Sequence, residues 1–585
     1  MAGINTCALR TLGQADRGGT AMGRSFDIEE LLRTASPATR REFLKRAAVT
    51  GLSGPALLYL LAATTRQADA AGAGRIAPAL ARAQGEPKRG GTMVVTGHQE
   101  VASLSPDDAG PTVHFVVVTQ IHNALVEQDE NFIFQPVLAE ALPEAAADGL
   151  SYTFKLRQGV TFHDGEPFTS EDVKYTYEWY MDPANAAINA NNFAAVATVE
   201  APDDSTVVVR LEEPNAAFLA QVATTFIVPA HYHGRIGEDA YKSQPIGTGP
   251  FKLKEWRAAE YTLVEAYDGH FRGRPHLDAF RLNVVPEASV RAIALETGDS
   301  DSSVWPLVTE DSLRLADDPA FVTLRTSSLA INHFPLNNEH PILGDKRVRQ
   351  AMMHAIDRQT LVDDIFSGAA TLATANLSPA LERFYNPEVP TYAFDPARAE
   401  ALLDEAGWTR AGDGIREKEG QKLSFVCTTI TGDQARRPEA EVAQQFLRDV
   451  GIDMQLEEAP VATILEKMRS GEMAASLFNW TYGGDAGDPD ALVTLRSDGA
   501  NNFSHYKNPR VDELLDQGLR ELDPEKRAVI YKEVQAIFAE DVPFLYMMFW
   551  DLFNLFRTRI KGLPSSALTA DQVYAKAYQF WIDEG

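Results

Sequence analysis

The stretch DGLSYTFKLRQGVTFHDGEPFTSEDV, residues 148–173, indicates the fold more clearly than any other part of the chain. Its first part, Ser151–Arg157, alternates apolar and polar side chains, which is typical of a half-buried β-strand. Asp164-Gly165 is a turn dipeptide, and Thr169 with Asp172 has the spacing of a capping box that begins a helix. Strand, turn and capped helix in this order predict a mixed α/β protein.

Similar local patterns extend in both directions from this stretch. Short alternating runs predict more strands in the first half, and helical spacing becomes more frequent in the second. Asp395-Pro396 is expected to begin a helix that Gly407 closes, because the cap and the first-turn proline occupy their favoured positions. Helical spacing also follows Val348, in a segment that Gly368 is expected to end. The predicted strands are 90–96, 198–201, 206–211, 250–256, 261–265 and 452–456, and a further helix spans 441–450.

Composition excludes several classes of protein. The 585 residues are 45% hydrophobic, enough for roughly two to four domains or lobes. A net charge of −28 argues against nucleic acid or an anionic membrane surface as the main partner. Two cysteines cannot form a disulfide framework or a cysteine-rich metal site. Cys427 lies in the strand-like run Leu423–Ile430 and is expected to be a small buried side chain rather than a catalytic one.

The first part of the chain has the composition of an export signal. Residues 1–83 contain 11 Lys and Arg against 6 Asp and Glu, the reverse of the rest of the chain. The run TRREFLK, residues 39–45, precedes the uncharged, mildly apolar stretch Ala47–Thr65. This arrangement resembles a twin-arginine signal, and the match is made by Arg40, Arg41, Phe43 and Leu44. A membrane-spanning anchor is the alternative, which Pro55 disfavours. We expect residues 1–85 to be a cleaved leader that directs the protein to the periplasmic or extracellular side of the membrane.

Several separated blocks, in the same order as in a known family, extend the resemblance along the chain. With residues 148–173 they resemble the signature of family 5 extracellular solute-binding proteins, the peptide, oligopeptide and nickel receptors of ABC importers. The similarity covers about residues 88–585. The further blocks are Pro136–Glu140, Gly247–Phe251, Lys346–Ala351 with Ala355–Asp357, Asp395-Pro396 with Ala406–Trp408, and Gly487–Asp490.

The resemblance implies an architecture and a function. It implies an α/β fold of two lobes joined by a hinge, the periplasmic-binding-protein fold, with an extra β-rich subdomain. We place lobe I at 88–325 plus 542–585, its subdomain at about 131–240, and lobe II at 326–541. The implied function is that of an extracytoplasmic receptor that captures a peptide-like solute by lobe closure and delivers it to an ABC permease. We expect a monomer that has no cofactor and is not an enzyme.

The best candidate for a ligand contact lies in the run WTYGGDAGDP, residues 480–489. In peptide-binding relatives an Asp four residues before this proline pairs with the peptide α-ammonium, and that position here is Asp485. A carboxylate in a cleft needs such a charged partner. Trp480 and Tyr482 are expected to supply flat apolar walls or a cation–π face. The alternative is a surface turn rich in glycine and aspartate.

The resemblance implies two further segments. Thr96, Gly97 and His98 follow the first strand, where dipeptide-binding relatives line the cleft with backbone and hydroxyl groups. Those relatives also carry an Arg that pairs with the ligand carboxylate just before the helix that leads to Gly451. This chain departs from that pattern, since its nearest candidates, Arg436 and Arg437, lie several residues later and are better suited to a helix surface than to a ligand carboxylate. Strict dipeptide specificity is therefore in doubt, and a longer peptide fits better.

Other kinds of chemistry have little support. The sequence after the leader lacks the nucleophile elbow, the zinc-protease motif and the complete dinucleotide fingerprint. His231 and His233 would place two imidazoles on one face of an extended segment, but no third ligand is nearby, and we expect no metal site. A nickel-chelate receptor and an oligosaccharide receptor remain alternatives within the binding class, and a secreted hydrolase is a remote one.

Overall fold

The computed structural model describes residues 86–584 apart from 108–111, 131, 305–306, 432, 434–435, 483–487 and 566–571. Residues 84–585 cluster into one compact unit. The leader predicted for residues 1–85 lies outside the described residues, and so do Arg40, Arg41, Phe43 and Leu44. Among the described residues, no helix is both long and apolar enough to cross a membrane.

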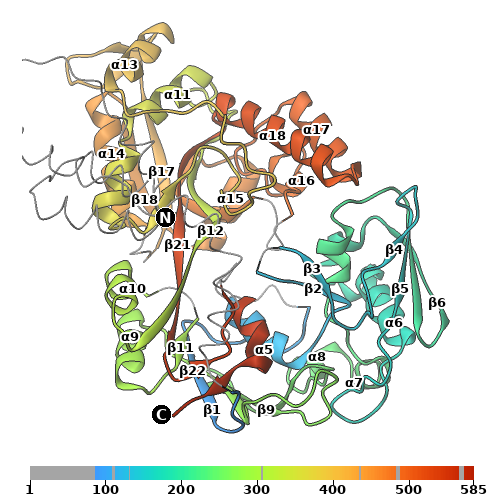
Figure 1. Ribbon diagram of the computed structural model, residues 1–585. Helices are drawn as coiled ribbons and strands as arrows, with labels where there is room; N and C mark the ends of the chain where they lie inside the picture. The colour runs from blue at the N-terminus through green and yellow to red at the C-terminus, as the bar shows by residue number, and fades with distance from the viewer. Residues whose placement is uncertain are drawn as a thin grey trace, which may run out of the picture. The chain divides into compact units, whose positions relative to one another are not determined.

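The unit is built on one mixed sheet (Figure 1). Its strands are hydrogen-bonded in the order β20-β12-β21-β11-β1-β10-β9-β8, and β13 pairs with β21 beside that path. The order brings together strands that are far apart in the sequence, so the sheet forms only when both halves of the chain are in place. Its strands are β1 (Thr92–Gly97), β8 (Phe251–Arg257), β9 (Tyr261–Ala266), β10 (Ala279–Val284), β11 (Ser302–Ser303), β12 (Phe321–Pro335), β13 (Ala370–Leu372), β20 (Phe478–Thr481) and β21 (Phe544–Arg557).

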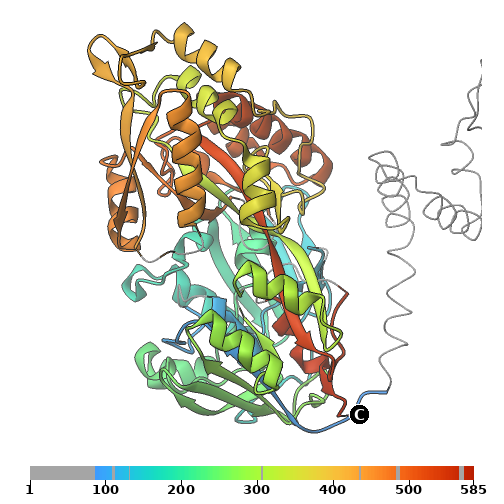
Figure 2. The ribbon, with the colours of Figure 1, turned by 90° about the vertical axis from the view of Figure 1, so that its left-hand side faces the viewer.

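Two of these strands are much longer than the others. β12 and β21 pair antiparallel along their length, and both views show them running together between the two halves of the unit (Figures 1 and 2). The pairing is regular up to Ser327 and resumes at Ile331, with a further irregularity between Asn332 and His333. Such breaks in register bend and twist a strand pair locally. The two strands are therefore a continuous but locally bent connection.

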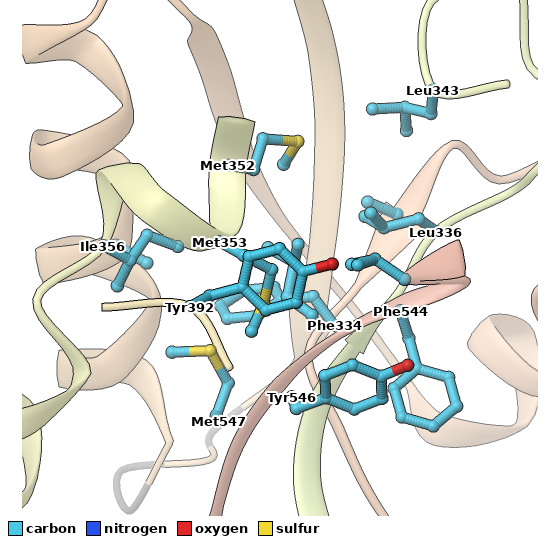
Figure 3. Close-up of a cluster of buried hydrophobic side chains, with 14 of the residues drawn as sticks. Phe334, Leu336, Leu343, Met352, Met353, Ile356, Tyr392, Phe544, Tyr546 and Met547 are labelled. Carbon is cyan, nitrogen blue, oxygen red and sulfur yellow. The ribbon is translucent and has the colours of Figure 1, made fainter. Parts of the chain in front are cut away.

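Three large hydrophobic cores lie on this framework. The first core uses residues from 93–121, 251–324 and 556–582, the subdomain core uses residues from 125–227, and the second core uses residues from 331–549. β12 contributes Leu324 to the first core and Phe334 to the second, and β21 contributes Phe556 and Phe544 in the same way. Figure 3 shows the second core, where these strands pack against helix α11 (Lys346–Ala355) and Tyr392. The first and second cores are thus separate but share the two long strands, whereas the subdomain core contains residues of neither strand.

The subdomain core includes apolar side chains of the stretch 148–173, the part of the sequence that indicates the fold most clearly. Its four-stranded sheet has the order β4-β5-β7-β6. The predicted capping box is confirmed, because Thr169 and Asp172 bond reciprocally at the start of α6. The elements of this region are β2 (Val126–Gln128), β3 (Phe134–Pro136), β4 (Glu144–Ala145), β5 (Ser151–Lys155), α6 (Ser170–Met181), β6 (Val196–Asp203), β7 (Thr206–Leu211), the short π-helix η4 (Leu219–Ala223), α7 (Ala230–Ile236) and α8 (Glu238–Tyr241).

The remaining elements lie around the first and second cores. Around the first core lie α5 (Thr112–Ile121), α9 (Ala288–Thr297), α10 (Thr309–Ala316), β22 (Ile560–Lys561) and β23 (Trp581–Ile582). Around the second core lie α12 (Arg358–Thr360), α13 (Pro396–Glu405), β14 (Thr409–Arg410), β15 (Arg416–Lys418), β16 (Gln421–Lys422), β17 (Ser424–Ile430), α14 (Arg437–Asp449), β18 (Asp453–Ala459), α15 (Val461–Ser470), β19 (Ala475–Ser476), α16 (Leu492–Leu495), α17 (Pro509–Arg520) and α18 (Pro524–Asp541). Of these, α9, α10 and α15 pack in smaller clusters of their own.

Most of the local predictions are confirmed, and two are wrong. Asp395 caps α13, and Gly407 follows it with a positive φ. Gly368 does not end the helix that contains Val348, because α11 stops at Ala355 and Asp357 then caps the short helix α12. The segment from His231 to His233 is helical rather than extended, since it lies in α7.

Candidate functional site

Strand β20 leads directly to the predicted ligand residues. It pairs with β12, so that Trp480 lies opposite Ile331 and Asn479 opposite Asn332. The half-buried indole of Trp480 packs edge-on against Phe503, with ring centroids 5.2 Å apart. β20 therefore places Trp480 at the margin of the second core, where part of its ring is accessible.

Tyr482, one residue beyond the strand, is part of that core. Its side chain is buried, and its ring stacks on Phe544 with centroids 5.0 Å apart. Its hydroxyl lies 2.8 Å from Nε2 of His333. Burial lowers the pKa of His333 to about 3, so its imidazole is neutral; Nδ1–H donates to the Ile331 carbonyl and Nε2 accepts from Tyr482. The structure thus places Tyr482 in the second core as an anchor, and its expected role as a flat apolar wall or cation–π face stays a prediction.

The chain is anchored again where it re-enters the described region. Asp488 accepts two hydrogen bonds from the buried guanidinium of Arg527, at 2.6 and 2.7 Å. Nε of Arg527 donates to the Gly518 carbonyl, 2.8 Å away. Residues 483–487, among them the predicted ligand residue Asp485, lie outside the described residues. The segment that contains Asp485 is therefore bounded by two buried anchors, Tyr482 on one side and Asp488 on the other.

A third anchor lies beneath β20. The side chain of Asn332 is buried, accepts a hydrogen bond from Asn479 at 2.8 Å, and donates to Oε2 of Glu439 at 3.1 Å. Glu439 lies in the first turn of α14 and is fully buried. Burial raises its pKa to about 8, so the carboxyl is mainly protonated at neutral pH. This neutral network ties β20 to the start of α14.

Arg436 is placed beside this network but already has a partner. It precedes α14 and forms an ion pair with the neighbouring Asp433, whose carboxylate also accepts from its backbone N–H at 3.2 Å. Both side chains are largely buried. Arg437, by contrast, is exposed and pairs with Glu441 and Glu458. In this structure Arg436 is therefore neutralised from within the chain, which weakens the expectation that it reaches a ligand carboxylate.

The second predicted segment lies at the end of β1. This strand runs parallel to both of its neighbours, β10 and β11, and the carboxyl ends of parallel strands are common positions for ligand sites. Thr96 is buried, and its hydroxyl approaches the Ser302 carbonyl at 3.4 Å. Gly97 has no room for a side chain, because a Cβ would lie 2.8 Å from Val113. His98 is half-buried, and burial and the charge of Arg291 lower its pKa to about 4.

The two predicted segments stand on different strands of the same sheet. β1 and β20 are separated by β11, β21 and β12. The described residues alone therefore do not unite Thr96, Gly97 and His98 with Trp480 in one site.

The histidine pair that we considered as a metal site has other partners. His231 forms a partly exposed pair with Asp164 at 2.8 Å. His233 is buried between the Tyr175 hydroxyl at 2.7 Å and Glu238 at 2.9 Å. Within the described residues, no group of three or more His, Cys, Asp or Glu side chains is arranged to hold a metal ion.

Sequence reasoning missed the residues that support the site. His333, Glu439 and Arg527 are buried polar side chains that lie far along the chain from the residues they hold. Local sequence patterns carry no signal for such pairings. The only available hint was the pair of acids Asp488 and Asp490 on either side of a proline, because acids so close together require a cation or donor when they are buried.

Comparison with known proteins identifies relatives over most of the chain. The family model of the bacterial extracellular solute-binding proteins, family 5, matches residues 134–504. Protein XP55 of Streptomyces lividans is 33% identical over 455 residues, 76% of this chain and 82% of that protein. The oligopeptide-binding protein AppA of Bacillus subtilis is 27% identical over 483 residues, 80% of this chain and 88% of that protein.

Two solved structures have the same fold. The structure of AppA from Bacillus subtilis in complex with a nonapeptide superposes with a TM-score of 0.74 and 25% identity, covering 85% of this chain and all of that one (100%). The structure of NikZ from Campylobacter jejuni in complex with Ni(L-His) gives a TM-score of 0.73 and 26% identity, covering 84% of this chain and 99% of that one.

Proposed function

The chain belongs to the bacterial extracellular solute-binding proteins of family 5, and on that basis we propose that it captures a peptide-like solute for an ABC importer. Its fold is the two-lobe fold of periplasmic binding proteins. One observation carries the mechanism: β12 and β21 run from the first core into the second and are locally bent between them. Two separate cores joined by such a pair can close on a ligand by hinge motion.

The lobes keep the bounds that the family resemblance implies, although Val542 and Phe544–Phe549 of the returning segment pack in the second core. Lobe I comprises 88–325 and 542–585, with the subdomain at about 131–240, and lobe II comprises 326–541. The hinge is placed at the register break between Ser327 and Ile331. The family setting also supports a membrane permease as the partner, a monomeric receptor, and a role without chemical turnover of the ligand.

The ligand class rests on the segment around Asp485. In this proposal Asp485 receives the α-ammonium of a peptide, and Trp480 offers its accessible ring face to the neighbouring part of the ligand. Tyr482 and Asp488 act by fixing the ends of the segment. Thr96, Gly97 and His98 form the opposing edge from lobe I.

The state of Arg436 bears on peptide length. A receptor for dipeptides needs a cation for the ligand carboxylate, because a buried carboxylate without a partner is costly. Arg436 is already paired with Asp433. We therefore favour a longer peptide, whose carboxyl end can remain outside the cleft. AppA from Bacillus subtilis, which was solved with a nonapeptide, is consistent with this choice.

A nickel chelate is the second candidate. The observation that favours it is the similarity to NikZ, which was solved with Ni(L-His). An amino-acid chelate presents chemical groups much like those of a peptide, so the same cleft can suit both classes.

Calorimetric titration tests the ligand class. The probes are a synthetic pentapeptide with a free amine, the same peptide with an acetylated amine, and nickel with histidine. We expect the free-amine peptide to bind and Asp485→Ala to weaken binding by more than about 2 kcal/mol, the scale for unpairing a buried charge. Asp498→Asn, which alters an exposed acid in the same lobe, serves as the matched control. Unchanged affinity in Asp485→Ala, or equal binding of the acetylated peptide, contradicts the role of Asp485.

The export route is part of the same proposal. Arg40 and Arg41, with Phe43 and Leu44, are expected to direct the folded protein through the twin-arginine pathway. Replacing both arginines by lysine keeps the charge and should leave the precursor in the cytoplasm, as measured by cell fractionation. Normal export of that variant contradicts the proposed route.

A further inference from the structure

The subdomain touches lobe II at a place away from the two long strands. The segment before η4 meets the end of α17, where the backbone N–H of Ala216 donates to the carbonyl of Leu519 at 2.7 Å. Figure 1 shows α16 and α17 on the side of lobe II that faces the subdomain. Along the chain, the subdomain and α17 are connected only by way of the strands of the central sheet. The contact therefore closes a second connection between parts that β12 and β21 already join.

The rim of the contact is an exposed ion pair. Nε and Nη2 of Arg520 donate to Oε2 of Glu213, at 3.1 and 2.8 Å. Beside it, Gly149 approaches Leu522 so closely that a Cβ on the glycine would lie 2.6 Å from Cδ1 of the leucine. Exposed ion pairs contribute about 0–1 kcal/mol each. This rim is therefore specific in its partners but easily broken.

The inner part of the contact is a half-buried amide that meets an acid. Nε2 of Gln221 donates to Oδ2 of Asp490 at 3.0 Å, and Asn215 donates to Oε1 of Gln221 at 3.3 Å. Gln221 lies in the π-helix η4, a distortion that is often found at functional sites. Burial and the charge of Asp488 raise the pKa of Asp490, which shows that the ionised carboxylate is disfavoured there. The amide of Gln221 offsets part of that cost by donating a hydrogen bond to the carboxylate. Asp490 is two residues from Asp488, the anchor of the predicted ligand segment.

These contacts have the character of a reversible interface. They are polar, they involve short segments, and the ion pair is solvent-accessible. Interfaces between domains of one chain that move relative to each other are typically small and polar in this way. Opening lobe II away from lobe I carries the subdomain with lobe I, because the subdomain sheet is inserted between strands β1 and β10 of the lobe I sheet in the sequence. An opening motion must then break the contact.

We propose that this contact is a latch, formed by Glu213, Ala216 and Gln221 of the subdomain with Asp490, Leu519 and Arg520 of lobe II, that holds the closed receptor. The inference rests on the proposed function, since it gives the subdomain a part in lobe closure. Gln221 and Asp490 are positioning residues: they act on the equilibrium between open and closed forms and through it on affinity. The latch stabilises the closed form relative to the open form whether or not a ligand is present.

The test is a distance measurement by pulsed electron spin resonance on the leader-free protein without ligand. Spin labels are attached at Glu178→Cys on α6 and Val529→Cys on α18, both exposed positions. Cys427 is fully buried, and burial raises the pKa of its thiol, so it stays unlabelled. In the protein with an unchanged latch, we expect a population with a short distance between the two spin labels. We expect its ratio to the long-distance population to fall at least threefold in Gln221→Ala and in Glu213→Arg.

Rescue separates a latch from a folding defect. Glu213→Arg combined with Arg520→Glu restores an ion pair of opposite polarity and should restore the short-distance population. Arg510→Ala removes an exposed ion pair with Glu533 within lobe II and should change nothing, which makes it the matched control. Identical distance distributions in the unchanged protein, Gln221→Ala and Glu213→Arg would overturn the latch, and so would failure of the double charge reversal to restore what Glu213→Arg removes. Because no ligand is used, either negative result leaves the receptor function standing.

Discussion

The hydroxyl of Tyr482 is bound to Nε2 of His333 at 2.8 Å, inside the second core. His333 is fully buried and belongs to β12, one of the two strands that join the lobes. Tyr482 directly precedes the segment that holds Asp485. One hydrogen bond thus connects the strand in which we propose the hinge to the start of the predicted ligand segment.

Tyr482→Phe should destabilise the protein, because it removes a buried hydroxyl and leaves the aromatic ring in place. Loss of the hydroxyl leaves the buried Nε2 of His333 without a donor, which costs about 1–3 kcal/mol. Urea unfolding, followed by tryptophan fluorescence, measures the change in the free energy of unfolding. Tyr261→Phe, whose hydroxyl bonds to the exposed Glu255, is the control and should change it by less than about 0.5 kcal/mol. Equal effects of the two substitutions would remove the anchoring role of Tyr482.

Arg527→Met should be strongly destabilising, because it leaves the carboxylate of Asp488 without its cation in a largely buried position. Breaking such a pair costs about 3–5 kcal/mol. The double variant with Asp488→Asn should be more stable than the sum of the two single changes predicts, since no unpaired charge remains. Arg510→Ala, which breaks an exposed pair on the neighbouring helix, is the control. Additive effects in a double-mutant cycle of urea unfolding would show that the two groups are not coupled.

Lowering the pH should decrease the free energy of unfolding, because histidines of lobe I are buried in the neutral form. Burial, and then the charge of His163, lower the pKa of His122 to about 3. Its folded pKa is below the unfolded value of 6.5, so its stabilising contribution is present above pH 6.5 and is lost progressively as pH falls toward the folded pKa. From pH 7 to pH 5 this single group accounts for a loss of about 2 kcal/mol.

The check is urea unfolding at pH 7 and pH 5 in the unchanged protein and in His122→Gln. The decrease in the free energy of unfolding should be smaller in the variant by that amount. His354→Gln alters a more exposed imidazole, which bonds to the Ala393 carbonyl, and should leave the decrease as it was. The same decrease in all three proteins would mean that His122 does not contribute to acid sensitivity.

Local structure followed from the sequence wherever the signal itself was local. The capping box from Thr169 to Asp172 spans only four residues of chain, and the helix between Asp395 and Gly407 is marked by a cap at its start and a glycine after its end. The prediction for the His231 segment was wrong because it rested on three residues alone. Alternation over three residues fits an extended strand, but these residues lie in α7. Short patterns are reliable only when a cap or a turn accompanies them.

The site was harder to predict because its supporting contacts are not local. Tyr482 was expected to supply a flat apolar wall to the ligand, and local sequence gave no sign of the histidine, 149 residues away, that holds it in the core. Arg436 was considered as a ligand contact, and the structure pairs it with Asp433 three residues before it. Asp485 remains a prediction, because it lies outside the described residues.

Native mass spectrometry of the gently purified, leader-free protein tests the central claim most directly. A bound passenger is detected on the intact protein and is then identified after denaturation. A receptor for peptide-like solutes should carry one passenger per chain, and the released passengers should be peptides, whose lengths report the preferred size. A passenger that is uniformly a sugar or another solute without an amine would contradict the claim, as would an empty protein that binds no member of a random pentapeptide library.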